Sequence, residues 1–172
     1  MDAGQRRQKI LELLKRNAQP VSASAIAAEF HVSRQIIVGD IALLRAANVA
    51  ISATPRGYIL QENTDNGEFI HTIACKHSRE DLLQELYTIV DNGGGLIDVI
   101  VEHPVYGQIS GQLHIFSRYD ADAFSEKLAK QDASPLLNLT NGVHLHTISC
   151  QSEEVYHRIL AALKTKGFLF EK

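Results

Sequence analysis

The sequence has no apolar run that approaches the roughly 20 residues of a membrane-spanning helix. Its first 17 residues, MDAGQRRQKILELLKRN, also lack the apolar core of a secretory signal. We therefore expect a cytoplasmic protein with no membrane partner. Cysteine is scarce too, being represented by Cys75 and Cys150 alone. Because structural disulfides are rare in reducing compartments, we interpret both cysteines as small buried side chains.

Charge is spread unevenly along the 172 residues. Residues 1–62 hold eight Lys and Arg against five Asp and Glu, whereas residues 63–172 hold nine against fifteen. A basic front part and an acidic back part indicate different partners for the two. The polar stretch at residues 62–67 is typical of a linker. The sequence therefore predicts two small domains, at residues 1–62 and 63–172.

The front domain has the pattern of a helix-turn-helix. The apolar residues of QKILELLK, residues 8–15, follow the spacing of an amphipathic helix. Ser22 is a suitable N-cap for a short helix over residues 23–30, and His31-Val32 predicts a tight turn. A second helix, capped by Ser33, follows this turn. Together these elements predict a DNA-binding helix-turn-helix.

The second of these helices carries the residues that we expect to read DNA. Its buried stripe consists of Ile37, Ile41 and Leu44, spaced four and then three residues apart. A cap hydroxyl can reach a phosphate, and polar side chains of the first turn can bond base edges in the major groove. The alternative is that these are ordinary solvated helix residues. The predicted contacts are the cap and the residues that point away from the stripe: Ser33, Arg34, Gln35, Val38 and Arg45.

A β-hairpin is predicted directly after this helix. Pro55-Arg56-Gly57 supplies the turn, and β-branched residues in 49–54 and 58–60 flank it. A hairpin in this place is the wing of a winged helix. Arg56 at its tip would face a phosphate or the minor groove, and the Tyr58 hydroxyl would donate a hydrogen bond to a phosphate.

The back domain is predicted to be an α+β sandwich. We expect strands at 69–75, 96–101, 108–115, 143–149 and 168–170, and helices at 79–90, 121–129 and 153–164. The order βαββαβ with a terminal αβ indicates helices on one face of an antiparallel sheet, with a ferredoxin-like topology. The first and fourth strands are neighbours in that topology.

Two histidines share one face of the predicted fourth strand, in NGVHLHTISC. Alternation places His144 and His146 on the same side, and His77 directly follows the neighbouring first strand. Glu85 lies on the helix that covers one face of the sheet. If that face also carries the histidines, the four side chains converge, and three imidazoles with a carboxylate suit Zn²⁺ or Ni²⁺. The alternative is that the histidines are satisfied core residues and Glu85 is a charge on a solvated turn.

Four stretches resemble the niacin-responsive transcriptional repressors of Gram-positive bacteria, in the same order and over essentially the whole chain: VSRQIIVGDIALLRAANVAISATPRGYIL, HTIACKHSREDLLQELYTIVDNGG, VEHPVYGQISGQL and NGVHLHTISC. That family joins a winged helix to a three-histidine (3H) domain. The resemblance implies a usually dimeric repressor of NAD biosynthesis and niacin-uptake genes, with nicotinic acid as its co-repressor. It also implies one divalent metal, nickel or zinc, on His77, Glu85, His144 and His146.

Further residues agree with the family, and two positions depart from it. His103 and Tyr106 match the family's loop EHPVYG and are candidates for holding the nicotinate, with His71 as a weaker candidate. The alternative is that this loop is only a tight turn in which His103 is structural. Gly39 stands where a longer polar side chain is expected, and Asn48 where the family often has glycine.

We expect a homodimer that binds an inverted-repeat operator in double-stranded DNA. The resemblance implies a regulator and no enzyme activity. Two rivals to a niacin-responsive repressor stay open at this point. One is a regulator for which the metal ion itself is the signal. The other is a metal-dependent hydrolase fused to a DNA-binding domain, although no nucleophile motif accompanies the histidines.

Overall fold

The computed structural model describes residues 2–47, 49–61 and 69–171. The chain forms two compact units, residues 1–64 and 65–172. The predicted linker at residues 62–67, the predicted domain boundary and the mismatch at position 48 all lie outside the described residues. In the described part of the chain, no helix combines the length and apolar character that a membrane crossing needs.

The first unit contains three helices followed by a two-stranded hairpin: α1 (Ala3–Arg16), α2 (Ala23–Phe30), α3 (Arg34–Ala46), β1 (Ile51–Thr54) and β2 (Gly57–Leu60). The hydroxyls of Ser22 and Ser33 cap α2 and α3, as predicted. His31 makes the turn between these helices in the left-handed conformation, with φ at 54°. Helix α1 begins earlier than its apolar stripe predicts, because Asp2 and Gln5 form a capping box at its start.

The predicted stripe of α3 is buried in the core of this unit. Ile37, Ile41 and Leu44 pack with apolar residues of α1 and α2. Asp40, on the same face, is 4% exposed and accepts hydrogen bonds from the Arg6 guanidinium. Arg7 also lies within ion-pair distance of Asp40, at 3.5 Å. Helix α3 is thus fixed to α1 both by apolar packing and by a buried carboxylate.

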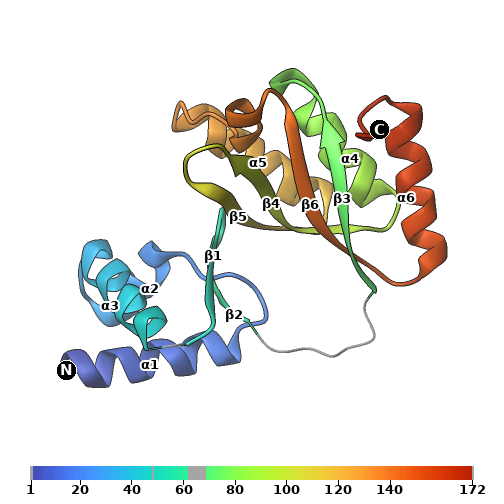
Figure 1. Ribbon diagram of the computed structural model, residues 1–172. Coiled ribbons are helices and arrows are strands. Elements are labelled where there is room, and N and C mark those ends of the chain that lie inside the picture. Colours follow the sequence, from blue (N-terminus) through green and yellow to red (C-terminus); the bar gives the residue numbers. More distant parts are fainter. Residues whose placement is uncertain (1, 48, 62–68, 172) are drawn as a thin grey trace. The chain divides into compact units, whose positions relative to one another are not determined.

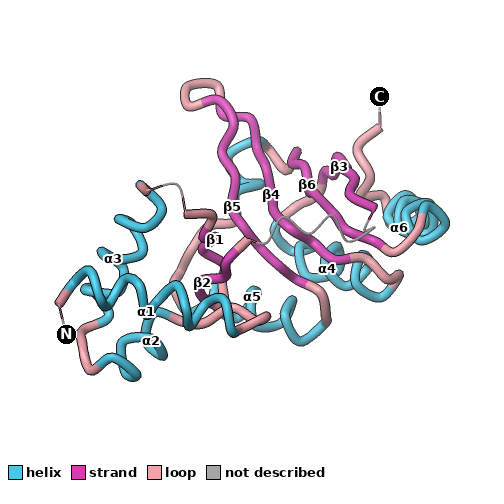
Figure 2. Tube along the Cα trace, turned by 90° about the horizontal axis from the view of Figure 1, so that it is seen from below, coloured by secondary structure: helices cyan, strands magenta, loops and turns pink. Residues whose placement is uncertain are grey.

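The second unit has the predicted order of strands and helices. Its elements are β3 (Phe69–Lys76), the 3₁₀ turn η1 (Arg79–Asp81), α4 (Leu82–Asp91), β4 (Gly95–His103), β5 (Gly107–Ile115), α5 (Arg118–Lys130), the 3₁₀ turn η2 (Leu136–Thr140), β6 (Val143–Cys150) and α6 (Glu153–Thr165). The four strands form one antiparallel sheet. One hydrophobic core joins α4, α5 and α6 to one face of that sheet (Figures 1 and 2). The α+β class is therefore confirmed.

The strand order differs in one respect from a ferredoxin-like sheet. The order is β3-β6-β4-β5, so the first and fourth strands are neighbours as predicted. In a ferredoxin-like fold, however, the third strand lies between the first and second, whereas here the fourth strand, β6, takes that place. The burial patterns give the physical reason. Strand β6 is buried or half-buried along its whole length and needs neighbours on both sides, while β5 has an exposed first half that suits an edge.

The predicted last strand, 168–170, is present only as a short bridge. Leu169 pairs with Cys75, and Phe168 accepts a hydrogen bond from the Lys76 backbone. This segment follows α6 and pairs with the outer side of β3, so the end of β3 that leads to His77 is not an open edge.

Helix α3 provides a test of the first unit's packing. Ile41 is 2% exposed and Leu43 is 57% exposed on the same helix. We expect Ile41→Ala to lower the free energy of unfolding by about 2–5 kcal/mol, because it removes buried methyl groups and leaves a cavity. Leu43→Ala serves as the control and should change it by less than about 0.5 kcal/mol. Urea denaturation of both variants measures the difference. Equal losses would show that α3 does not bury the predicted face.

Candidate functional site

Glu85 is a buried carboxylate on α4. It lies three residues after Leu82 and one before Leu86, on the side of the helix that faces the sheet. Its residue exposure is 1%. The alternative interpretation of Glu85 as a charge on a solvated turn is therefore wrong.

Three imidazoles meet this carboxylate. His77 Nε2 lies 2.6 Å from Glu85 Oε2, and His144 Nε2 lies 2.9 Å from Oε1. His146 Nε2 is 3.3 Å from Oε1. All three rings are buried, with His144 and His146 on the helix-covered face of β6 and His77 just beyond the end of β3. The structure thus brings together the four residues that were predicted as metal ligands.

The opposite nitrogen of each imidazole contacts a backbone carbonyl. His77 Nδ1 lies 2.7 Å from the Ser78 oxygen, His144 Nδ1 2.8 Å from the Gly142 oxygen, and His146 Nδ1 2.7 Å from the Asp98 oxygen. A carbonyl only accepts, so each Nδ1 must carry a proton and donate it. Each Nε2 then has either a lone pair or a second proton. This is the arrangement by which outer partners fix the orientation of metal-binding histidines.

The charges of this cluster are strongly coupled. Burial would raise the pKa of the Glu85 carboxyl, but the charge of His146 and the hydrogen bonds with His144 and His77 hold it well below its usual range. Burial likewise lowers the pKa of His77 and of His146, yet contact with Glu85 raises the pKa of both above their ordinary value. The carboxylate therefore stays ionised and attracts positive charge.

Protonation of the imidazoles is a poor way to satisfy the buried nitrogen and oxygen atoms of the cluster. Contact of all three Nε2 atoms with the carboxylate would need three buried imidazolium groups for one negative charge, which is costly in a core. The His146 Nε2 atom is buried and has no hydrogen-bond partner among the described residues, although it lies within ion-pair distance of Glu85. A divalent cation that accepts the Nε2 lone pairs and the carboxylate removes the need for those protons. The residues therefore fit such an ion.

An apolar cavity of about 190 Å³ adjoins the cluster. Glu85, His144 and His146 form part of its wall. The rest of the lining comes mainly from apolar residues of α4, β4, β5, α5 and the η2 region, including Leu86, Val99, Leu113, Phe124 and Leu136. An apolar cavity of about 150 Å³ is sufficient to hold benzene. The space beside the cluster therefore matches a single aromatic ring and is too small for a dinucleotide.

The three predicted effector contacts do not line this cavity. His103 Nδ1 accepts hydrogen bonds from the backbone N–H groups of Val105 and Tyr106, and Tyr106 is 78% exposed at the hairpin tip. His71 stacks on Tyr156 and contacts Glu153 at 3.0 Å. The two hydrogen bonds to His103 match its alternative interpretation, in which this residue only builds the turn.

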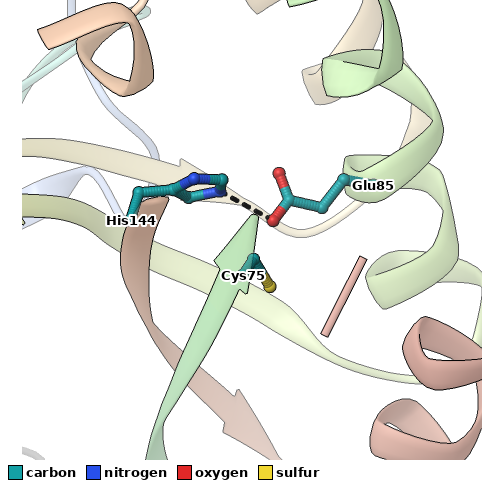
Figure 3. Close-up of side chains that lie close together, drawn as sticks. All are labelled: Cys75, Glu85 and His144. Atoms are coloured by element: carbon teal, nitrogen blue, oxygen red, sulfur yellow. Dashed lines mark hydrogen bonds and ion pairs between the residues drawn. The ribbon is translucent and has the colours of Figure 1, made fainter. Parts of the chain in front are cut away.

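Cys75 belongs to the surroundings of the cluster, which its interpretation as a small buried side chain did not predict. Its Sγ, a Glu85 carboxylate oxygen and a His144 ring nitrogen all lie within 4.8 Å of one another. Figure 3 shows the three side chains, which come from β3, α4 and β6. One signal in the sequence points to this position. Cys75 alternates with His77, and it lies opposite His144 once the first and fourth strands are paired.

The predicted DNA-contacting residues of α3 lie mostly on its surface. Ser33, Arg34, Gln35 and Arg45 are exposed, and Val38 is half-buried against the core. Gly39 shares the exposed side with Gln35, one turn earlier. A Cβ at Gly39 would meet no atom within 4 Å, so nothing in the described part of the chain requires a glycine there.

The predicted wing is the β1–β2 hairpin, whose two-residue turn is Pro55-Arg56. Arg56 is half-buried, and its backbone N–H donates to the Thr54 hydroxyl. Tyr58 is half-buried and packs against the core of the unit, while its backbone pairs with Val21. The wing is therefore held against the segment that precedes α2.

Comparison with known proteins gives two family matches. Residues 6–59 match an HTH domain family, and residues 70–172 match the 3H domain family. The chain is 44% identical over 168 residues to the probable transcription repressor NiaR of Thermotoga maritima. The aligned region covers 98% of this chain and 95% of that protein. It is 37% identical over 168 residues to the transcription repressor NadR of Bacillus subtilis, covering 96% and 93%.

Gly142 offers a test of how the cluster is positioned. Its φ is +90°, and a Cβ there would lie 2.5 Å from the His77 carbonyl oxygen. Because Gly142 also accepts the His144 Nδ1 hydrogen bond, we expect Gly142→Ala to weaken Zn²⁺ binding about 10- to 100-fold.

Gly107→Ala is the matched control. Gly107 also has a positive φ, +72°, but a Cβ there would meet nothing within 4 Å. Competition with a chromophoric chelator measures both affinities. An unchanged affinity in Gly142→Ala, or an equal loss in both variants, would contradict this positioning role.

Proposed function

This chain belongs to the family of transcription repressors that join a helix-turn-helix domain to a 3H domain, and we propose that it represses NAD biosynthesis and niacin-uptake genes in response to nicotinic acid. Repression of transcription follows from membership of this family, because both relatives are transcription repressors and not enzymes. The regulated genes, the effector, the metal, the dimeric state and the cytoplasmic location belong to the proposal.

The observation that carries the proposal is the orientation of the three imidazoles. Each turns Nε2 toward Glu85 while its Nδ1 contacts a backbone carbonyl. We propose that His77, Glu85, His144 and His146 hold one divalent ion. Nitrogen and carboxylate donors suit Zn²⁺ or Ni²⁺ better than Ca²⁺ or Mg²⁺. When bound, the ion supplies a fixed positive charge at the cavity wall.

The cavity beside this cluster is the proposed effector site. Its volume of about 190 Å³ and its apolar lining suit a pyridine ring. A cation on the wall formed by Glu85, His144 and His146 would attract the carboxylate of nicotinic acid. An apolar cavity whose wall includes three residues of the cluster favours this proposal over an effector site at the exposed hairpin tip of His103 and Tyr106.

DNA recognition is assigned to the exposed side of α3. The polar side chains of Arg34 and Gln35 lie in its first turn, where a recognition helix meets base edges. A single module of this size makes few contacts, so we propose a homodimer that binds an inverted repeat. The wing, with Arg56 at its turn, would add a backbone contact.

Nicotinic acid must bind the DNA-competent arrangement of the protein better than the other arrangement in order to act as co-repressor. A direct metal sensor would respond to the ion alone and would not use the cavity. The hydrolase alternative lacks support from the relatives, which are transcription repressors. The presence of a ring-sized cavity beside the cluster favours the niacin-responsive repressor.

Operator binding with metal and nicotinate varied independently tests this function. We expect nicotinate to tighten binding of the metal-loaded wild type about 5- to 150-fold, the usual range for coupled sites. His146→Ala should lose this response but keep its basal DNA affinity. Gel shifts on the upstream region of a NAD-biosynthesis operon measure both quantities.

Two results separate the alternatives. Arg34→Ala, the control for DNA contact, should weaken binding by about 1–3 kcal/mol with or without nicotinate. A full response of the wild type to metal alone would identify a direct metal sensor. An equal nicotinate response in the wild type and His146→Ala would remove the metal cluster from the switch.

A further inference from the structure

A fifth donor atom lies at the proposed metal cluster. Cys75 is 0% exposed, and its side chain lies beside the Glu85 carboxylate (Figure 3). Its Sγ lies within 4.8 Å of both a Glu85 oxygen and a His144 nitrogen, and His144 Nε2 itself lies 2.9 Å from Glu85 Oε1. A thiolate, a carboxylate and an imidazole grouped in this way are a donor set that zinc accepts.

The strand pairing fixes the thiol in this place. Cys75 is the Cα partner of His144, and Ile73 is the partner of His146. Paired residues on neighbouring strands point to the same face of the sheet, so Cys75 faces Glu85 together with both histidines of β6. On its other side, β3 is paired with Leu169, which shields this position.

A second observation also points to a ligand at this place. His146 Nε2 is fully buried, lies 3.3 Å from Glu85 Oε1 and has no hydrogen-bond partner among the described residues. The cluster therefore contains a donor nitrogen that the carboxylate and its neighbours leave unsatisfied. A positive ion held between the sheet and α4 would accept the lone pair of this nitrogen.

We propose that Cys75 is a sulfur ligand of the metal, in addition to the histidine and glutamate ligands. This inference rests on the proposed function, because it requires that the cluster bind an ion. On binding, the thiol proton is released to solvent and the sulfur lone pair forms the coordinate bond, without any change of oxidation state.

A thiolate changes which metal the site selects. Oxygen and imidazole donors alone leave hard ions such as manganese as competitors, whereas a thiolate favours softer ions such as zinc. The sulfur thereby restricts the ion at the cavity wall to a borderline metal.

X-ray absorption of the full-length protein loaded with Zn²⁺ tests the proposal directly. We expect a sulfur shell at about 2.3 Å beside nitrogen and oxygen neighbours at about 2.0–2.2 Å. Cys75→Ser should lose the sulfur shell while still binding Zn²⁺. With Co²⁺ as the probe, the sulfur-to-metal charge-transfer absorption should be present in the wild type and absent from Cys75→Ser.

Cys150→Ser is the matched control. Cys150 is the other cysteine of the chain and is also buried, but its Sγ contacts the carbonyls of Phe69 and Ser152 at 3.6 and 3.5 Å. This variant leaves Cys75 as the sole thiol, so retention of the sulfur shell identifies its source even if Cys75→Ser fails to fold.

Two outcomes would overturn the inference in distinguishable ways. A wild-type spectrum with nitrogen and oxygen neighbours only would leave Cys75 as a buried free thiol beside the cluster and the four-residue metal site intact. Failure of the wild type to bind Zn²⁺ or Co²⁺ would remove both the sulfur ligand and the proposed metal site.

Discussion

The buried carboxylate of Glu85 is the constraint on which the C-terminal domain depends. An ionised group that is 1% exposed is stable only when it is paired and hydrogen-bonded. Its partners come from the end of β3 and from β6, so α4 must lie across exactly these two strands, which are neighbours in the sheet. The backbone carbonyls of Ser78, Gly142 and Asp98 then hold the rings. The placement of α4, the order of the strands and the turns that hold the rings together pair this one carboxylate.

The cluster adjoins the proposed effector site. It forms one wall of a ring-sized apolar cavity, so any ion held there acts on whatever the cavity binds. The N-terminal domain contributes a recognition helix whose apolar stripe and buried Asp40 fix it to α1, leaving Arg34 and Gln35 on the surface. In the proposed function, the C-terminal domain selects the effector by size and charge, and the N-terminal domain presents the exposed side of α3 to DNA.

Local patterns in the sequence predicted the features that depend on local physics. The spacing of Ile37, Ile41 and Leu44 predicted the buried face of α3, and alternation predicted the shared face of His144 and His146. The central position of β6 could not be predicted from local patterns. Strand β5 can pair with either edge of β4, and the choice depends on how much apolar surface each arrangement of the whole sheet buries. The cavity depends on the η2 segment, whose short 3₁₀ turn has no periodic signal. Cys75 is a buried free thiol, as predicted, but its closeness to Glu85 and His144 depends on how α4 packs on β3 and β6, which no local pattern reveals.

A crystal structure of the full chain with nicotinic acid, measured on both sides of the zinc and nickel absorption edges, would test the metal cluster and the effector cavity together. The account predicts one anomalous peak within coordination distance of His77, Glu85, His144 and His146, with nicotinate in the adjoining cavity. A structure in which the imidazoles contact Glu85 directly without any anomalous peak, or in which nicotinate binds far from this cavity, would contradict it.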